Sequence, residues 1–204
     1  MFALALTLAT TVVSKEIVLT TFDGAATTTQ KWRAVNDPVM GGKSVATFEV
    51  NHTAAIGVFD GQTKIVPSLK APGFCNMQTE GAKFADISSA NAIKLVVRSV
   101  VDYAGFKVSF GPAPRSVGSF FASYKADFNI TTSADWQTIF VPFEHFSSKW
   151  SGFTGEPTTK CSVKHPEVCP DAAHLAKLTS FELSAEGVEG KFHLEVQSIG
   201  AVTV

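Results

Sequence analysis

Hydrophobic and polar residues alternate along most of this chain with a period of two. In the segment 44–50, Ala46, Phe48 and Val50 fall on one face of an extended chain. In the segment 93–98, one face carries Ile93, Leu95 and Val97, and the opposite face carries Lys94. A period of two is that of a half-buried β-strand. The pattern therefore predicts strands at 17–22, 44–50, 56–60, 74–79, 93–98, 106–110, 120–130, 136–143, 181–184 and 192–196.

Turn signals separate these segments, and helical patterning is scarce. Asp23-Gly24 and Asp60-Gly61 are typical turn dipeptides, and only Asp171 to Leu178 has a helical pattern. Strands do not alternate with helices, which argues against a doubly wound fold. We therefore expect an all-β protein, a jelly-roll β-sandwich with at most one or two short helices. The lack of a linker predicts one domain over residues 16–204.

The first 15 residues form a segment of a different kind. Phe2 to Val13 is an uncharged run of apolar residues and threonines, too short to span a bilayer. It is typical of the hydrophobic part of a secretory signal, with cleavage near Ser14. No Lys or Arg precedes the run, and a buried strand is the alternative. We interpret residues 1–15 as a targeting segment and expect no transmembrane span in the mature chain.

Two sequons and a cysteine pair agree with a secretory or extracellular location. Asn51-His52-Thr53 and Asn129-Ile130-Thr131 are acceptor triplets for N-glycosylation. Cys161 and Cys169 lie close together among prolines, which favours a disulfide-closed loop. With His165 and His174 they also form a zinc-like spacing, but prolines interrupt any helix there and secretion favours oxidation.

Composition narrows the function classes. With 17 Lys and Arg against 18 Asp and Glu, the net charge is −1 and no basic run occurs, so we expect no nucleic-acid partner. The chain lacks a nucleophile elbow, a phosphate-binding loop, a dinucleotide fingerprint and a zinc-protease motif. We therefore predict a non-enzymatic binding protein without cofactor or metal.

The segment from Trp32 to Ser44 contains the most specific motif of the chain. Trp32 precedes the run Asn36-Asp37-Pro38-Val39-Met40-Gly41-Gly42-Lys43-Ser44. This segment resembles the signature of the complex I intermediate-associated protein family, a Trp followed by Asn-Asp-x-Val-Met-Gly-Gly-x-Ser. Further similar segments are Gly57 to Gly61, Asp135 to Gln137, Val141 to Phe143 and Gly190 to Phe192.

The resemblance implies both a fold and a role. The fold is a galactose-binding-like jelly-roll sandwich. The role is non-catalytic: a chaperone-like or scaffold protein that binds assembly intermediates of NADH:ubiquinone oxidoreductase (respiratory complex I) in mitochondria. A mitochondrial location is thus the alternative to secretion.

The residues of the Asn36–Ser44 loop permit two interpretations. Gly41 and Gly42 allow a close backbone approach, Asn36 and Asp37 offer side-chain oxygens, and Met40 offers an adaptable apolar contact. The candidate binding set is Trp32, Asn36, Asp37, Met40, Gly41, Gly42 and Ser44. The same residues suit a loop that only fastens two strands, with Trp32 in the core.

The alternative function is a secreted, lectin-like carbohydrate-binding module. Trp150 and Phe153 lie in a polar loop where aromatic rings can stack on sugars. Packing of this loop onto the sandwich is the competing interpretation of both rings.

Overall fold

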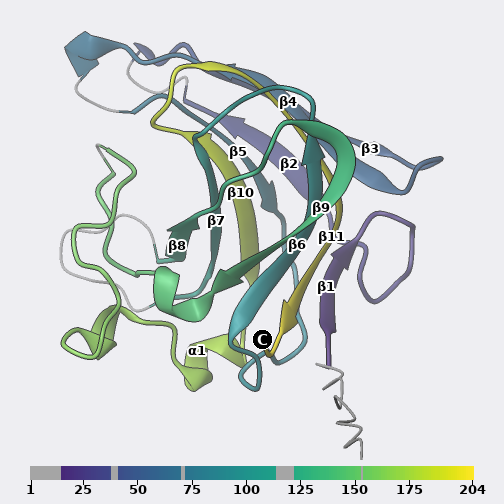
Figure 1. Cartoon of the computed structure of the whole chain (residues 1–204), viewed down its shortest axis with the longest axis vertical. Helices are drawn as coiled ribbons and strands as arrows, with labels where there is room; N and C mark the ends of the chain where they lie inside the picture. Colours follow the sequence, from purple (N-terminus) through teal and green to yellow (C-terminus); the bar gives the residue numbers. More distant parts are fainter. Residues whose placement is uncertain (1–14, 38–40, 70–71, 114–121, 153) are drawn as a thin grey trace, which may run out of the picture.

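The computed structural model describes residues 15–37, 41–69, 72–113, 122–152 and 154–204. In these ranges two antiparallel sheets face each other and enclose the core (Figure 1). The jelly-roll β-sandwich expected from the alternating pattern is confirmed. The first 14 residues, and thus nearly all of the suggested targeting segment, lie outside the described ranges.

The first sheet has six strands in the order β3-β4-β11-β6-β9, with β1 also pairing with β11. Their bounds are β1 Ile17–Thr21, β3 Val45–Asn51, β4 Ile56–Thr63, β6 Ala92–Ser99, β9 Ser133–Pro142 and β11 Gly190–Val202. The inward side chains of β6 include Ile93, Leu95 and Val97, all fully buried. The alternation in the sequence therefore separates the core side of this sheet from its outer side.

The second sheet has five strands in the order β2-β5-β10-β7-β8. Their bounds are β2 Trp32–Asn36, β5 Phe74–Thr79, β7 Phe106–Gly111, β8 Tyr124–Asp127 and β10 Ser180–Glu186. Cys75 and Met77 on β5 and Leu183 on β10 face the core and are fully buried. Cys75 is a free thiol, and burial raises its pKa to about 12.

Aromatic rings fill much of the space between the sheets. The ring centroids of Phe59 and Phe192 lie 4.8 Å apart, and those of Tyr103 and Phe106 lie 5.0 Å apart. These distances are typical of aromatic contacts in protein cores. The many phenylalanines of the chain thus serve largely as core side chains.

The structure departs from the alternating pattern in three places. Residues 32–36 form an edge strand that the pattern did not predict, and β8 is shorter than the predicted strand at 120–130. On β7 every residue is buried, including Lys107 and Ser109. The loop that contains Glu156 covers the outer side of β7 at Lys107. The sequence of β7 alone does not predict this contact.

Outside the sheets, the described residues include one short α-helix and three 3-10 turns. The helix α1 spans Ala172–Leu175 and is capped by the side chain of Asp171, within the segment predicted to be helical. The turns are η2 Pro67–Leu69, η3 Phe143–His145 and η4 Pro166–Val168. None of the described helices is both long enough and apolar enough to cross a membrane.

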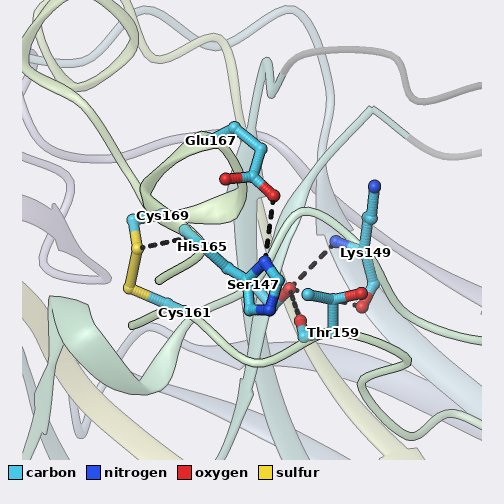
Figure 2. The surroundings of a disulfide bond; sticks show 7 residues. All are labelled: Ser147, Lys149, Thr159, Cys161, His165, Glu167 and Cys169. Atoms are coloured by element: carbon cyan, nitrogen blue, oxygen red, sulfur yellow. Dashed lines mark hydrogen bonds and ion pairs between the residues drawn. A yellow bond between two sulfur atoms is a disulfide. The ribbon is translucent and has the colours of Figure 1, made fainter. Parts of the chain in front are cut away.

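The predicted disulfide joins Cys161 to Cys169 beside η4. Figure 2 shows the pair next to His165, whose ring Nδ1 lies 3.4 Å from the Glu167 carboxylate. Because both sulfur atoms are bonded to each other, neither is a thiolate for the alternative zinc arrangement.

Candidate binding face and signature loop

The signature segment begins with a cluster of aromatic rings that joins the two sheets. Trp32 on β2 packs against Phe22 and Phe48, with all three ring centroids 6.0–6.2 Å apart. Phe48 belongs to β3 of the other sheet. The Asn36 side-chain amide also crosses between the sheets, donating a hydrogen bond to the Ala46 carbonyl at 3.1 Å.

The carboxylate of Asp37 is the centre of the loop. It is 7% exposed and accepts hydrogen bonds from the Ser44 backbone N–H (2.8 Å) and the Ser44 hydroxyl (3.1 Å). It also accepts one from the Phe74 backbone N–H at 3.3 Å. Ser44 precedes β3 and Phe74 begins β5, so one side chain fastens strands of both sheets.

Gly42 has no room for a larger side chain. A Cβ atom on Gly42 would lie 1.6 Å from the Asp37 carbonyl oxygen and 2.6 Å from its carboxylate carbon. The glycine thus allows the loop to fold tightly over Asp37.

These contacts support the interpretation that the loop holds strands of the two sheets together. Its role in binding a ligand stays a prediction. Asp37 and Ser44 are buried and bonded to each other, whereas Gly41 is exposed. Met40 and its two preceding residues lie outside the described ranges.

A second candidate site lies on the outer side of the five-stranded sheet. The strand register places two rows of mostly polar side chains across all five strands. We call this surface the polar face. Its rows are Arg33, Gln78, Glu182, Ser109 and Lys125, and Val35, Asn76, Ser184, Lys107 and Asp127.

Residues 147–152 and 154–160, the covering loop, pack over one side of the polar face. Ser147 exchanges two backbone hydrogen bonds of 3.0 Å with Lys125 on β8. The Ser147 hydroxyl also bonds the Thr159 carbonyl at 2.6 Å, which holds the two ends of the loop together (Figure 2). Gly155 approaches the sheet so closely that an added Cβ would lie 2.8 Å from the Glu186 carboxylate carbon.

A buried ion pair lies under the covering loop. Lys125 Nζ and Glu186 Oε2 are 2.6 Å apart, and both side chains are 6% exposed. The same ammonium lies 3.7 Å from the centroid of the Trp150 ring, and the Trp150 indole N–H donates to the Ser123 carbonyl at 3.3 Å. A cation over an indole face is attractive, so the pair also holds Trp150 in position.

Lys107 is a second buried cation of the polar face. Its ammonium contacts Asp127 and lies 3.2 Å from Glu156 of the covering loop. Burial alone would lower the pKa of Lys107, but the hydrogen bonds and charges of these carboxylates raise it above its ordinary value. Lys107 therefore stays charged and ties the covering loop to the sheet.

Two adjoining hollows lie on the polar face, and Glu182 and Ser123 line both of them. The hollow beside Trp150 has a volume of about 70 Å³, and the one above Ser109 and Gln78 about 150 Å³. Burial raises the pKa of Glu182 above its ordinary value, although nearby Lys125 and a hydrogen bond from Ser184 lower it. Acceptor oxygens of a carboxylate thus lie where a small polar ligand fits.

Ser109 lines the larger hollow, and its hydroxyl has no partner among the described residues. The residue is 2% exposed. Buried polar groups usually have a partner, so an unpaired hydroxyl at a hollow indicates a place for one.

Of the two predicted ligand aromatics, Trp150 lies half-buried at this face and Phe153 lies outside the described ranges. The sequence pattern did not single out Glu182, Ser109 and Lys125. Each is an isolated polar residue in a predicted strand, and only the register of five strands brings the three together.

Both predicted glycosylation sites are exposed. Asn51 ends β3, and its side-chain oxygen accepts from the Ala54 N–H at 3.0 Å. Asn129 follows β8 on the surface. Glycosylation of either stays a prediction.

The outer side of the six-stranded sheet carries a chain of charges. His193 lies 2.6 Å from Asp60 and 3.2 Å from Glu195, and Glu195 lies 2.6 Å from Arg98. The Arg98 guanidinium lies over the Trp136 ring at 4.6 Å. Because every member has a partner, this chain of charges is a network that joins strands.

Fold and site together define a β-sandwich domain with one outer sheet face that is polar and hollowed. The sequence matches the model of the family Complex I intermediate-associated protein 30 over residues 20–196. The chain therefore belongs to this family. No significant match was found among curated proteins.

Solved structures share the fold at low sequence identity. The Family 11 carbohydrate-binding module from Clostridium thermocellum, in complex with a beta-1,3-1,4-mixed-linked tetrasaccharide, has 14% identity and a TM-score of 0.58, covering 95% of this chain and 98% of that one. The Family 11 carbohydrate-binding module of the cellulosomal cellulase Lic26A-Cel5E of Clostridium thermocellum has 15% identity and a TM-score of 0.57. This match covers 93% of this chain and 95% of that one. PfGH50B has 9% identity and a TM-score of 0.53, covering 94% of this chain but 24% of that one.

Proposed function

We propose that this protein is a non-enzymatic binding domain that acts as a chaperone-like or scaffold partner of other proteins. The observation that supports this proposal is the family match over residues 20–196. The family name describes association with intermediates of complex I, and by family membership we extend that role to this chain.

Affinity capture after cross-linking in living cells tests the proposal. We expect subunits of complex I assembly intermediates to be enriched over a control that carries the same tag alone. Loss of the protein should also lower the amount of assembled complex I on native gels. A normal amount of complex I, with none of its subunits captured, would contradict this role.

As the alternative to this role, we propose that the chain enters the secretory pathway, as its N-terminal segment and two sequons suggest. A secreted protein does not meet complex I in mitochondria. Location thus discriminates between this proposal and the assembly role, and fractionation of cells that produce the full chain measures it.

Carbohydrate binding is the second candidate function, and the polar face favours it. Sugars are recognised by amide, hydroxyl and carboxylate groups next to an aromatic ring, and Asn76, Glu182 and Trp150 line the smaller hollow. A glycan array with the purified chain tests this function, and we expect binding to neutral oligosaccharides. An array without any bound glycan would exclude it.

A further inference from the structure

The two hollows that Glu182 lines indicate where a carbohydrate ligand would bind and which groups would contact it. We propose that they bind the hydroxyl groups of a neutral sugar ring, with Glu182 and Ser109 as its hydrogen-bonding partners and Trp150 as one wall. This inference rests on the second candidate function. It places the sugar on the face of the sheet, whereas the sequence pointed only to an aromatic loop.

Ser109 supplies the first observation. Ser109 lines the larger hollow, and its buried hydroxyl has no hydrogen-bond partner within the described residues. A hydroxyl can donate one hydrogen bond and accept others, which is also what a sugar hydroxyl does. A bound ring would therefore satisfy Ser109, and an apolar ligand would leave it unpaired.

Glu182 supplies the second observation. It is opposite Ser109 in the strand register and lines both hollows. Ser184 donates to one of its oxygens at 3.1 Å and the Asn76 side chain also hydrogen-bonds to it, but a carboxylate can accept about four hydrogen bonds and so retains capacity to accept. A carboxylate accepts short, strong hydrogen bonds from hydroxyl groups, and two oxygens can accept from neighbouring hydroxyls of one ring.

The charges at the site favour a neutral ligand. Lys125 lines the smaller hollow, and its ammonium is already 2.6 Å from Glu186. Glu182 and Glu186 thus place two carboxyl groups at the smaller hollow beside one ammonium, an arrangement that disfavours an anionic ligand. An acidic sugar should therefore bind less tightly than its neutral counterpart.

The wall formed by Trp150 is fixed before a ligand arrives. Lys125 lies against its ring and Ser123 accepts its indole N–H. A side chain that is already ordered loses little conformational entropy on binding, so this arrangement favours affinity.

Isothermal titration of the purified full chain tests the site. The probes are the β-1,3-1,4-linked glucotetraose and other neutral tetrasaccharides that the array selects, with tetragalacturonate as the acidic probe. We expect Glu182→Gln to weaken neutral binding about tenfold or more, as for loss of a hydrogen bond to a charged group. Ser109→Ala should weaken it about threefold to tenfold.

Two controls separate this site from general effects. Glu49→Gln and Thr47→Ala change similar groups on the exposed side of β3, and both should leave binding unchanged. The melting temperature of each variant shows whether it is folded.

Each result has a defined meaning. If neutral sugars bind the wild type and both folded variants equally, the proposed site is wrong while the carbohydrate function stands. Tighter binding of tetragalacturonate than of neutral probes would also overturn the proposal. If no neutral or acidic sugar binds the wild type, both the site and the carbohydrate function fail, and the protein-binding role is unaffected.

Discussion

At the scale of single residues, Asp37 and Gly42 have the most restricted surroundings in the signature loop. The Asp37 carboxylate accepts three hydrogen bonds in a buried position, and Gly42 leaves no space for a side chain above it. A buried acceptor of this kind is costly to change because the donors around it lose their partner. We therefore expect substitutions of Asp37 or Gly42 to lower the stability of the protein more than substitutions at exposed positions nearby.

We predict that Asp37→Asn lowers the free energy of unfolding by about 1.5–3 kcal/mol, since a charged acceptor is replaced by an amide that brings its own donors. Urea unfolding measures this change. The control Asp135→Asn, at an exposed position of β9, should change stability by less than about 0.5 kcal/mol. Equal stability of wild type and Asp37→Asn would show that the loop does not fasten the sheets.

His193 gives a pH dependence with a definite sign. Partial burial lowers the pKa of His193, but hydrogen bonds and charges from Asp60 and Glu195 outweigh it and raise the pKa above its ordinary value. A raised pKa in the folded state means that the stabilisation is fully present below the unfolded pKa. It is lost as the pH rises through the folded pKa.

We therefore predict that the free energy of unfolding falls by roughly 1 kcal/mol or less from pH 6 to pH 9 because of this group. His193→Gln should remove that part of the slope in urea titrations. His52→Gln, at an exposed position, should retain it. A slope that survives His193→Gln would assign the dependence to another group.

At the scale of elements, the covering loop and strands β8 and β10 depend on one another through buried charges. Lys125 and Glu186 are buried together, and the loop adds Trp150 above them. Removing one partner of a buried pair leaves an unpaired charge, which costs much more than the pair contributes. The pair thus links the stability of this side of the sheet to the position of the loop.

Lys125→Met should accordingly lower the free energy of unfolding by about 3–5 kcal/mol. The double variant Lys125→Met/Glu186→Leu should recover most of that loss because it removes both members of the pair. Lys94→Met is the matched control, since Lys94 and Glu16 are also 2.6 Å apart but more exposed, and it should cost less than about 1 kcal/mol. A double variant as unstable as the single one would contradict this explanation, and urea unfolding decides it.

At the scale of the whole molecule, the sequence predicted the sandwich well and the polar face poorly. Alternation of the kind seen at Ile93 and Leu95 depends only on local neighbours, so it could be read from the chain. The pairing of Glu182 with Ser109 depends on which strands are adjacent, and the burial of Lys107 depends on a distant loop. Such contacts follow from the register of the sheets, which the local pattern does not contain.

A prediction about the mature molecule follows from the exposed sequons. If the chain is secreted, mass spectrometry of the native protein should find glycans on Asn51 and Asn129 and a mature terminus near residue 14. Both asparagines are accessible, so the folded structure does not block modification. Unmodified asparagines together with an intact N-terminal segment would contradict secretion. Asn36 serves as an internal control because it is not in a sequon.

The fastening of two sheets by Asp37 also limits what the family signature can reveal. The described side chains of this motif form hydrogen bonds within the same chain, so the motif is a mark of the fold. Two proteins can then share this motif and still differ in what they recognise, because the polar face is built from other residues. A role should accordingly be transferred between members only where the outward residues of β10 and β7 also agree, and comparison of Glu182 and Ser109 across members is the informative test.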